Sequence, residues 1–235
     1  MHAGKLLIIG GNLHGFSAPA SAYSESEKAG IGSLRVLMPD AIQKTVGRFM
    51  PEADFGPSTP SGSFASRSLD AWFEQASWAD AVLLAGDLGR NSETAILIES
   101  FVSKYDGQIT LTKDAADYII ATPLTLLDRP ATTLVLSFAQ LQKLAKNARS
   151  VTAFTFNMDL LRLVDALHEF TMQHKTYIVT KHLGTMIVAV NGQVSTTKID
   201  QDVDVWRVIT AAKATVWWLQ HPNKPFEALT TALVA

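Results

Sequence analysis

The 235-residue sequence contains no cysteine. Disulfides, thiolate metal ligands and a cysteine nucleophile are therefore excluded, so any catalysis depends on carboxylates, lysine, histidine, hydroxyls or backbone groups. No apolar run reaches the roughly 20 residues that span a membrane, and the first eleven residues lack the small-residue cleavage site of a signal peptide. We therefore expect a cytoplasmic protein without a membrane partner.

An excess of charge of either sign is also missing. The 20 basic and 22 acidic residues are scattered and give a formal net charge of −2. Without a basic stripe to neutralise phosphates, nucleic acid is not an expected partner. The histidines show no paired spacing with carboxylates, so we expect no metal site in the protein. No serine stands between glycines as in a nucleophile elbow, which argues against a serine hydrolase.

Hydrophobic residues make up 47% of the chain, which is enough to bury one large core, so we expect a single domain spanning residues 1–235. Short β-type runs alternate with stretches of helical period, the pattern of βαβ units around a mostly parallel sheet. Residues 6–9 and 81–85 are continuously apolar, which predicts helices on both faces of that sheet. Strands are predicted at residues 5–9, 34–38, 81–85, 108–112, 133–136, 152–154, 176–180 and 186–190.

Other local signals mark helices and turns. Pro19 suits the first turn of a helix that ends near Gly30, and Asn157 suits the cap of a helix whose apolar stripe runs over residues 160–170. The loop 56–68 is rich in Ser, Pro and Gly, and we expect it to be mobile. Asn191-Gly192 predicts a tight hairpin turn and hence antiparallel edge strands.

A family resemblance starts at residues 7–12, LIIGGN, which are followed by Gly15, Ala18-Pro19 and AGIG at residues 29–32. These segments resemble the first strand, loop and helix of the ADP/ATP-dependent NAD(P)H-hydrate dehydratases of the ribokinase-like superfamily. DAVLLAGDLGR at residues 80–90 resembles the family's next glycine-rich loop, with Asp87 where the family usually has glycine. Similar segments follow at 109–116, 134–140, 180–185 and 201–205. The resemblance implies an α/β fold, a ribokinase-like three-layer α/β/α sandwich with a mostly parallel central sheet and an antiparallel edge hairpin.

The resemblance also implies a set of site residues. Asp204 matches the catalytic aspartate, which would act as general base or proton relay when water is removed from the hydrated nicotinamide ring. ADP or ATP, with or without Mg²⁺, is the implied cofactor, and a homo-oligomer is the implied assembly. The implied nucleotide-binding residues are Lys181, Gly184, Thr185, Asp202 and Val203. The candidate substrate-binding residues are Asn12, His14, Asp87, Gly89, Arg90, Asp114 and Ser137.

Several positions depart from the family pattern. Ser137 and Gln140 stand where the family has histidine and glutamate. The turn at residues 201–203 lacks glycine, so side chains and the charge of Asp202 oppose the approach of a phosphate to the helix that follows.

Most candidates also have an alternative structural interpretation. Asp202 or Asp204 can cap the late helix, and Asp114 can cap the helix that it heads. Asp87 can pair with Arg90 structurally, while His14 and Lys181 can simply be solvated. The sequence therefore leaves three functions open: a divergent dehydratase, an inactive ribokinase-like scaffold that binds a ligand or assembles structurally, and, ranked last, a small-molecule kinase.

Overall fold

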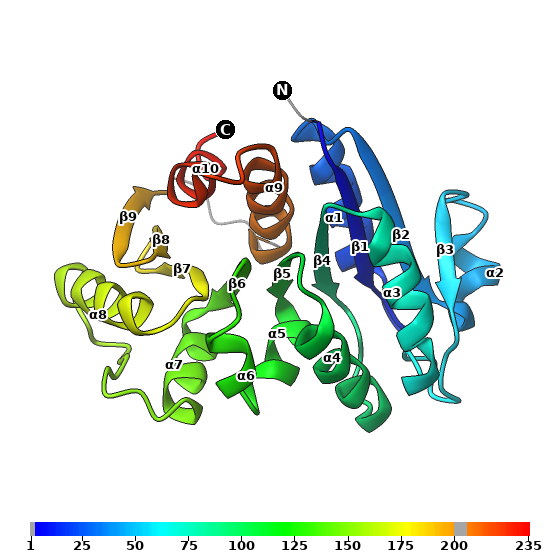
Figure 1. Ribbon diagram of the computed structural model, residues 1–235, viewed down its shortest axis with the longest axis horizontal. Helices are drawn as coiled ribbons and strands as arrows, with labels where there is room; N and C mark the ends of the chain where they lie inside the picture. The colour runs from blue at the N-terminus through cyan, green and yellow to red at the C-terminus, as the bar shows by residue number, and fades with distance from the viewer. Residues whose placement is uncertain (1–2, 200–205) are drawn as a thin grey trace.

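The computed structural model describes residues 3–199 and 206–235, and it contains a nine-stranded sheet in the order β3-β2-β1-β4-β5-β6-β7-β8-β9. Every neighbouring pair from β3 to β7 is parallel, whereas β8 pairs antiparallel with both β7 and β9. The mostly parallel sheet and its antiparallel edge are as predicted (Figure 1). The strands are β1 (Lys5–Gly10), β2 (Ser33–Pro39), β3 (Ala53–Gly56), β4 (Ala81–Gly86), β5 (Gln108–Thr112), β6 (Thr132–Ser137), β7 (Tyr177–His182), β8 (Thr185–Val190) and β9 (Gln193–Lys198).

Helices cover both faces of the sheet, which confirms the three-layer sandwich. One layer holds α1, α9 and α10, and the other holds α3, α4, α5, α7 and α8 (Figure 1). The helices are α1 (Ser17–Lys28), α2 (Gln43–Val46), α3 (Leu69–Trp78), α4 (Ser92–Lys104), α5 (Lys113–Ile120), α6 (Leu124–Leu127), α7 (Phe138–Asn147), α8 (Leu160–Gln173), α9 (Trp206–Gln220) and α10 (Pro225–Thr231), with short 3₁₀ turns η1 (Asp40–Ile42) and η2 (Ser66–Ser68). Over the described residues, no helix is both long and apolar enough to cross a membrane.

The apolar runs explain this layering. Leu6 and Ile8 pack into the core beneath α1 and α9, whereas Leu7 and Ile9 pack into the core on the opposite face. All four side chains are fully buried. Because successive side chains of a strand point to opposite faces, an unbroken apolar run requires cover on both sides.

Two tight turns build the antiparallel edge. Leu183 and Gly184 join β7 to β8, and Asn191 and Gly192 join β8 to β9, with positive φ at all four residues. Two-residue turns with positive φ at both positions match the right-handed twist of the strands that they connect. The predicted Asn-Gly hairpin is thus present.

Three local predictions are wrong. Residues 152–154 form no strand, because β7 already pairs with β6 and leaves no place between them for a short run. The edge strand β3 was not predicted. The cap of α8 is Asp159, whose carboxylate accepts a hydrogen bond from the Arg162 N–H at 2.8 Å, and Asn157 lies two residues earlier.

Contacts also hold the segment 56–68 that was expected to be mobile. Asp40 accepts a hydrogen bond from the Ser58 N–H at 3.0 Å, and the Thr94 hydroxyl donates to the carbonyl of Phe64 at 2.7 Å. The Phe64 ring is fully buried and lies edge-on to Trp72, with ring centroids 5.1 Å apart. The middle of the segment is therefore anchored in the core.

The aromatic cluster around Trp72 gives a test of this anchoring. Trp72 is fully buried and also contacts Phe101 edge-on. We expect Trp72→Ala to lower the free energy of unfolding by about 3–5 kcal/mol, because it leaves a large cavity. Trp72→Phe keeps a ring in place and should cost clearly less. Urea unfolding of both variants measures this, and equal losses would contradict the packing described.

Candidate functional site

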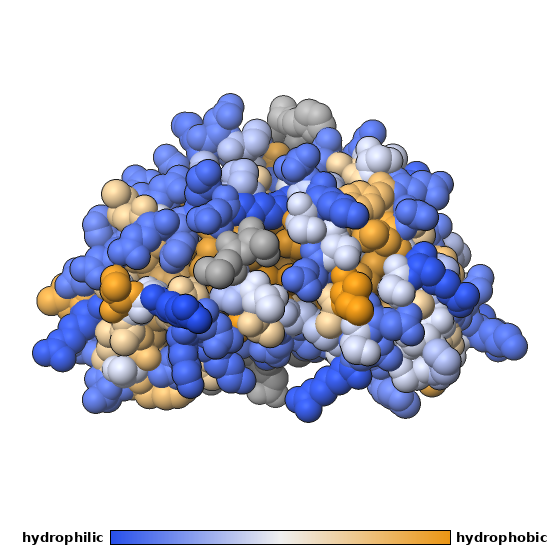
Figure 2. Space-filling model, turned by 60° about the horizontal axis from the view of Figure 1, so that its bottom comes forward, coloured by the Kyte–Doolittle hydropathy of each residue, from blue (hydrophilic) through white to orange (hydrophobic). Residues whose placement is uncertain are grey.

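The polar candidates gather where the parallel strands end. Strands β1, β4, β5, β6 and β7 are consecutive in the sheet, and their carboxyl ends meet at one edge. Figure 2 turns that edge, the bottom of Figure 1, towards the viewer. In open α/β sheets, ligands bind at this edge. Asn12, Asp87, Asp114, Ser137 and Lys181 lie at or directly after these five strand ends.

Asp87 is the centre of the hydrogen bonding at this edge. Its carboxylate accepts hydrogen bonds from the Ala18 N–H at 2.7 Å, the Ser17 hydroxyl at 3.1 Å and the Lys113 ammonium at 2.5 Å. Ala18 belongs to the first turn of α1, which has no side-chain cap of its own. Asp87 therefore supplies the negative charge that the N-terminus of α1 favours. The alternative that Asp87 pairs with Arg90 is wrong, since its partner is Lys113.

These contacts set the protonation of Asp87. Burial raises the pKa of its carboxyl group, but the hydrogen bonds from Lys113 and from the Ala18 N–H outweigh burial and hold the pKa below its ordinary value. The side chain of Asp87 is 14% exposed and that of Lys113 is 28% exposed. The Asp87 carboxyl group is thus ionised at neutral pH, and the pair is partly shielded from solvent.

Asp114 supports the loop after β4. Its Oδ2 accepts hydrogen bonds from the N–H groups of Leu88 at 2.8 Å and Gly89 at 3.1 Å. Burial raises the pKa of Asp114, and the nearby charge of Asp87 adds to the rise. Asp114 was expected to cap α5, but it lies inside the first turn, and Thr112 occupies the cap position. Asp114 binds the neighbouring loop instead.

Asn12 closes the loop after β1. Its amide donates to the carbonyl of Asp87 at 2.5 Å, and its side-chain oxygen accepts from the His14 N–H at 2.7 Å. Asn12 is buried, so both ends of its side chain serve the backbone. The His14 residue is exposed.

A pocket of about 680 Å³ opens beside this network, between α4, α5 and α7. Three candidates line it: Gly89, Arg90 and Asp114. Tyr118 in its wall donates to the carbonyl of Gly89 at 2.6 Å, and Lys143 lines the pocket as a second cation. The volume lies within the range of small-molecule sites, and the wall carries charges of both signs.

Ser137 and Gln140 serve the fold. The Ser137 hydroxyl accepts the N–H of Gln140 at 3.3 Å, and the Gln140 side chain accepts the N–H of Ser137 at 3.0 Å, which is a capping box at the start of α7. Gln140 is also buried, donates to the carbonyl of Lys113 at 2.7 Å and accepts from Arg207 at 2.9 Å. Ser137 and Gln140, at which the sequence departs from the pattern of the dehydratases that it resembles, therefore have structural partners.

The residues suggested for nucleotide binding are only partly described. Lys181 is the penultimate residue of β7, Gly184 lies in the following turn and Thr185 begins β8. Asp202, Val203 and the proposed catalytic Asp204 lie outside the described residues.

Lys181 lines a pocket of about 180 Å³ together with Met186, Trp206 and Lys213. This volume is below that of typical sites for drug-sized ligands. The cations suit a phosphate group, but the described part of the pocket does not enclose a whole nucleotide.

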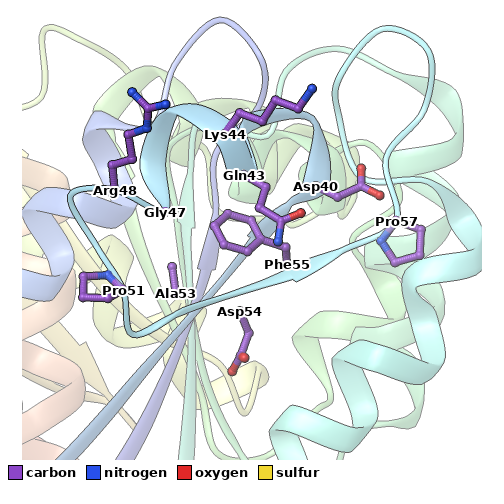
Figure 3. Close-up of a pocket in the computed structure, with 10 residues that line it drawn as sticks. All are labelled: Asp40, Gln43, Lys44, Gly47, Arg48, Pro51, Ala53, Asp54, Phe55 and Pro57. Atoms are coloured by element: carbon purple, nitrogen blue, oxygen red, sulfur yellow. The ribbon is translucent and has the colours of Figure 1, made fainter.

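A separate pocket of about 920 Å³ lies at the edge strand β3, away from these candidates. Lys44 and Arg48 project from its rim, whereas Asp54 points the other way (Figure 3). None of the candidate residues lines it. Within residues 3–199 and 206–235, no three His, Asp or Glu side chains gather to hold a metal ion.

The sequence interpretation missed several members of the site, above all Lys113, but also Ser17 and Tyr118. Lys113 follows directly after β5 and adopts a positive φ of 51°. The sequence does show that Lys113 is a charged residue at the end of a predicted strand. Its pairing with Asp87, however, depends on the order of the strands in the sheet.

The capping box leads to a first prediction for this edge. We expect Ser137→Ala to lower the free energy of unfolding by about 1 kcal/mol, because the helix loses its cap. Ser137→Asp keeps an acceptor at the cap and should retain most of the stability. Chemical unfolding of the pair measures this, and no loss in the alanine variant would rule out the capping role.

The depressed pKa of Asp87 makes its contribution to stability dependent on pH. A lowered folded-state pKa stabilises the protein above the unfolded value of about 3.9, and the gain disappears as the pH falls through the folded pKa. Asp87→Asn retains a residue that tolerates positive φ, so it should lose mainly the charged interactions, about 1–3 kcal/mol at pH 7. Unfolding at pH 7 and at pH 3 should show the difference from the wild type shrinking in acid. A difference that is constant with pH would contradict this.

The geometry can be compared with known proteins. No protein-family model matches the chain. A bifunctional NAD(P)H-hydrate repair enzyme from Methanocaldococcus jannaschii is 30% identical over 120 residues, which are 49% of this chain and 23% of that protein. The corresponding enzyme from Salinibacter ruber is 30% identical over 114 residues, 47% of this chain and 21% of that protein. The matched region thus spans less than a quarter of either relative.

Solved structures match almost the whole chain. A ribokinase-like superfamily protein from Enterococcus faecalis V583 has a TM-score of 0.76 at 13% identity, covering 99% of this chain and 76% of the other. The ADP/ATP-dependent NAD(P)H-hydrate dehydratase from Bacillus subtilis, co-crystallised with ATP/Mg²⁺, has a TM-score of 0.67 at 14% identity and covers 99% of this chain and 78% of the other. The chain therefore has the ribokinase-like fold and, over about half its length, resembles the NAD(P)H-hydrate repair enzymes in sequence.

Proposed function

We propose that this protein is a divergent NAD(P)H-hydrate dehydratase, which removes water from hydrated NAD(P)H with ADP or ATP as cofactor. The observation that carries the proposal is the pocket of about 680 Å³ beside the strand ends, where Gly89, Arg90 and Asp114 meet. Sequence similarity to two repair enzymes supports the choice of reaction over other activities of the fold.

Two cations in the pocket wall support a substrate that carries phosphate groups, and the same wall also holds the carboxylates of Asp114 and Asp117. Arg90 and Lys143 are exposed cations in its wall, and a guanidinium matches the geometry of phosphate oxygens. Tyr118 donates a hydrogen bond to the Gly89 carbonyl and Asp114 accepts one from the Gly89 N–H, so the two residues fix the loop at Gly89. In this proposal the loop places Arg90, and Arg90 binds a phosphate of the substrate.

The reaction also needs proton transfer, since water leaves as a hydroxyl group and a proton. Asp204 is proposed for this role from its sequence match alone. Lys181 and Lys213 are proposed to contact phosphates of ADP or ATP from the small pocket that they line. No step of the reaction is assigned to the nucleotide.

A second candidate function is an inactive ribokinase-like scaffold that binds a ligand or assembles with itself. The contacts of Ser137 and Gln140 favour it, because both residues stabilise α7 and neither offers a base. The lack of glycine at residues 201–203 weakens the third candidate, a small-molecule kinase, because a kinase needs the same anion-binding turn and no separate substrate pattern is present.

Binding and turnover separate these functions. A ligand that binds only the folded state raises the melting temperature, by an amount set by its concentration relative to Kd. We expect millimolar ADP or ATP to raise it, and hydrated NADH to be converted to NADH by the wild type but not by Asp204→Asn. Nucleotide binding without turnover would support the scaffold. No stabilisation by either nucleotide would reject the dehydratase and the kinase together.

Arg90 gives a sharper test of the pocket. Arg90→Met should raise KM for hydrated NADH about tenfold or more, because a charged hydrogen bond to the substrate is lost, while kcat changes less. Arg149→Met removes another exposed arginine, outside the pocket lining, and is the matched control. An unchanged KM in Arg90→Met would place the substrate elsewhere.

A further inference from the structure

We propose that Lys113 is an anion-binding residue of this site, and that Asp87 holds its ammonium group until a phosphate-bearing ligand displaces it. The inference rests on the proposed function only for the nature of the ligand, a nucleotide or dinucleotide. The residue, its partner and the exchange between them follow from contacts at the strand ends.

Backbone strain distinguishes this pair from the structural ion pairs of a surface. Lys113 has φ 51°, a left-handed conformation that lysine avoids, and Asp87, of a residue type that tolerates this region, has φ 57°. Glycine would adopt the conformation of Lys113 without strain. The chain thus places a strained lysine at one strand end and joins it to a carboxylate at the neighbouring strand end. Strain retained at a ligand-binding edge points to function.

The pair is also built so that only one partner can leave. Asp87 keeps the Ala18 N–H and the Ser17 hydroxyl as donors when Lys113 departs, and the N-terminus of α1 still favours its charge. Among the described residues, Asp87 is the hydrogen-bond partner of the Lys113 ammonium, which can donate three bonds. Lys113 is the more exposed of the two and has a flexible stem.

The position of Lys113 gives the displaced ammonium a destination. Lys113 immediately precedes Asp114, which lines the pocket of about 680 Å³. The backbone carbonyl of Lys113 accepts a hydrogen bond from the Gln140 side chain at 2.7 Å. The backbone is therefore fixed while the side chain can turn. Together with Arg90 and Lys143, a released Lys113 would bring a third cation to a ligand phosphate.

Two substitutions of opposite expected effect test the proposal. Calorimetric titration at low salt uses sodium pyrophosphate and ADP as probes. Lys113→Met keeps the length of the stem and should weaken binding of both probes about tenfold or more. Asp87→Asn removes the internal competitor and should tighten binding severalfold. The double variant should lose that gain, because the released cation is no longer present.

Matched controls separate this from general charge effects. Lys104→Met removes an exposed lysine at the end of α4, and Asp165→Asn removes an exposed carboxylate of α8 that does not line the pocket. Both should change the affinity less than twofold. Circular dichroism confirms that each variant is folded, and the Asp87→Asn arm stands even if Lys113→Met does not fold.

The outcomes distinguish the inference from the proposed function. Equal affinity of the wild type and Lys113→Met, no tightening in Asp87→Asn, or no binding of either probe by the wild type would overturn the role of Lys113. If Lys113→Met loses binding of the probes and the wild type does not turn over hydrated NADH, the role of Lys113 is supported and the dehydratase is rejected. If the wild type and Lys113→Met turn over hydrated NADH equally well, the dehydratase is supported and the role of Lys113 is rejected.

Discussion

Because helices cover both faces of the sheet, its strands carry charged side chains mainly where they end, and this constraint concentrates the chemistry at one edge. Leu6, Leu7, Ile8 and Ile9 are fully buried, and polarity in that chain segment begins with the loop that holds Asn12. Burying an unpaired charge among such residues would be costly. Parallel strand order then brings loops from distant parts of the sequence together, so the edge becomes a site without any single loop being long.

Asp87 shows how this edge is held together. The Asp87 carboxylate contacts the first turn of α1 and Lys113, the first residue of α5. The backbone carbonyl of Asp87 accepts a hydrogen bond from the side-chain amide of Asn12. Three loops that follow β1, β4 and β5 are thereby fixed relative to each other. The sequence of the glycine-rich loop alone does not reveal these contacts, because two of the three join residues about 70 positions apart along the chain.

The sequence predicted what depends on local pattern and failed where neighbours in space decide. Apolar runs located most strands, and Asn191-Gly192 located a turn, because side-chain period and positive φ are local properties. Residues 152–154 have strand-like composition, but β6 and β7 pair directly and leave no place for them between the two strands. The sequence offered Arg90, three residues away, as an alternative structural partner of Asp87. Neither segment alone reveals the strand order and register that bring Lys113 to Asp87.

Polar replacements at this edge differ in what they do to the backbone. Ser137 and Gln140 lower the cost of unpaired N–H groups at the start of α7. The Ser137 hydroxyl accepts the N–H of Gln140, and the Gln140 side chain accepts the N–H of the cap residue Ser137. Lys113 adds a cost instead, because a left-handed lysine is strained and its ammonium satisfies no N–H group at a helix end. A residue that only stabilises its surroundings needs no further explanation. The strain of a partly exposed cation beside a pocket does, and the anion binding proposed for Lys113 accounts for it in addition to the contact with Asp87.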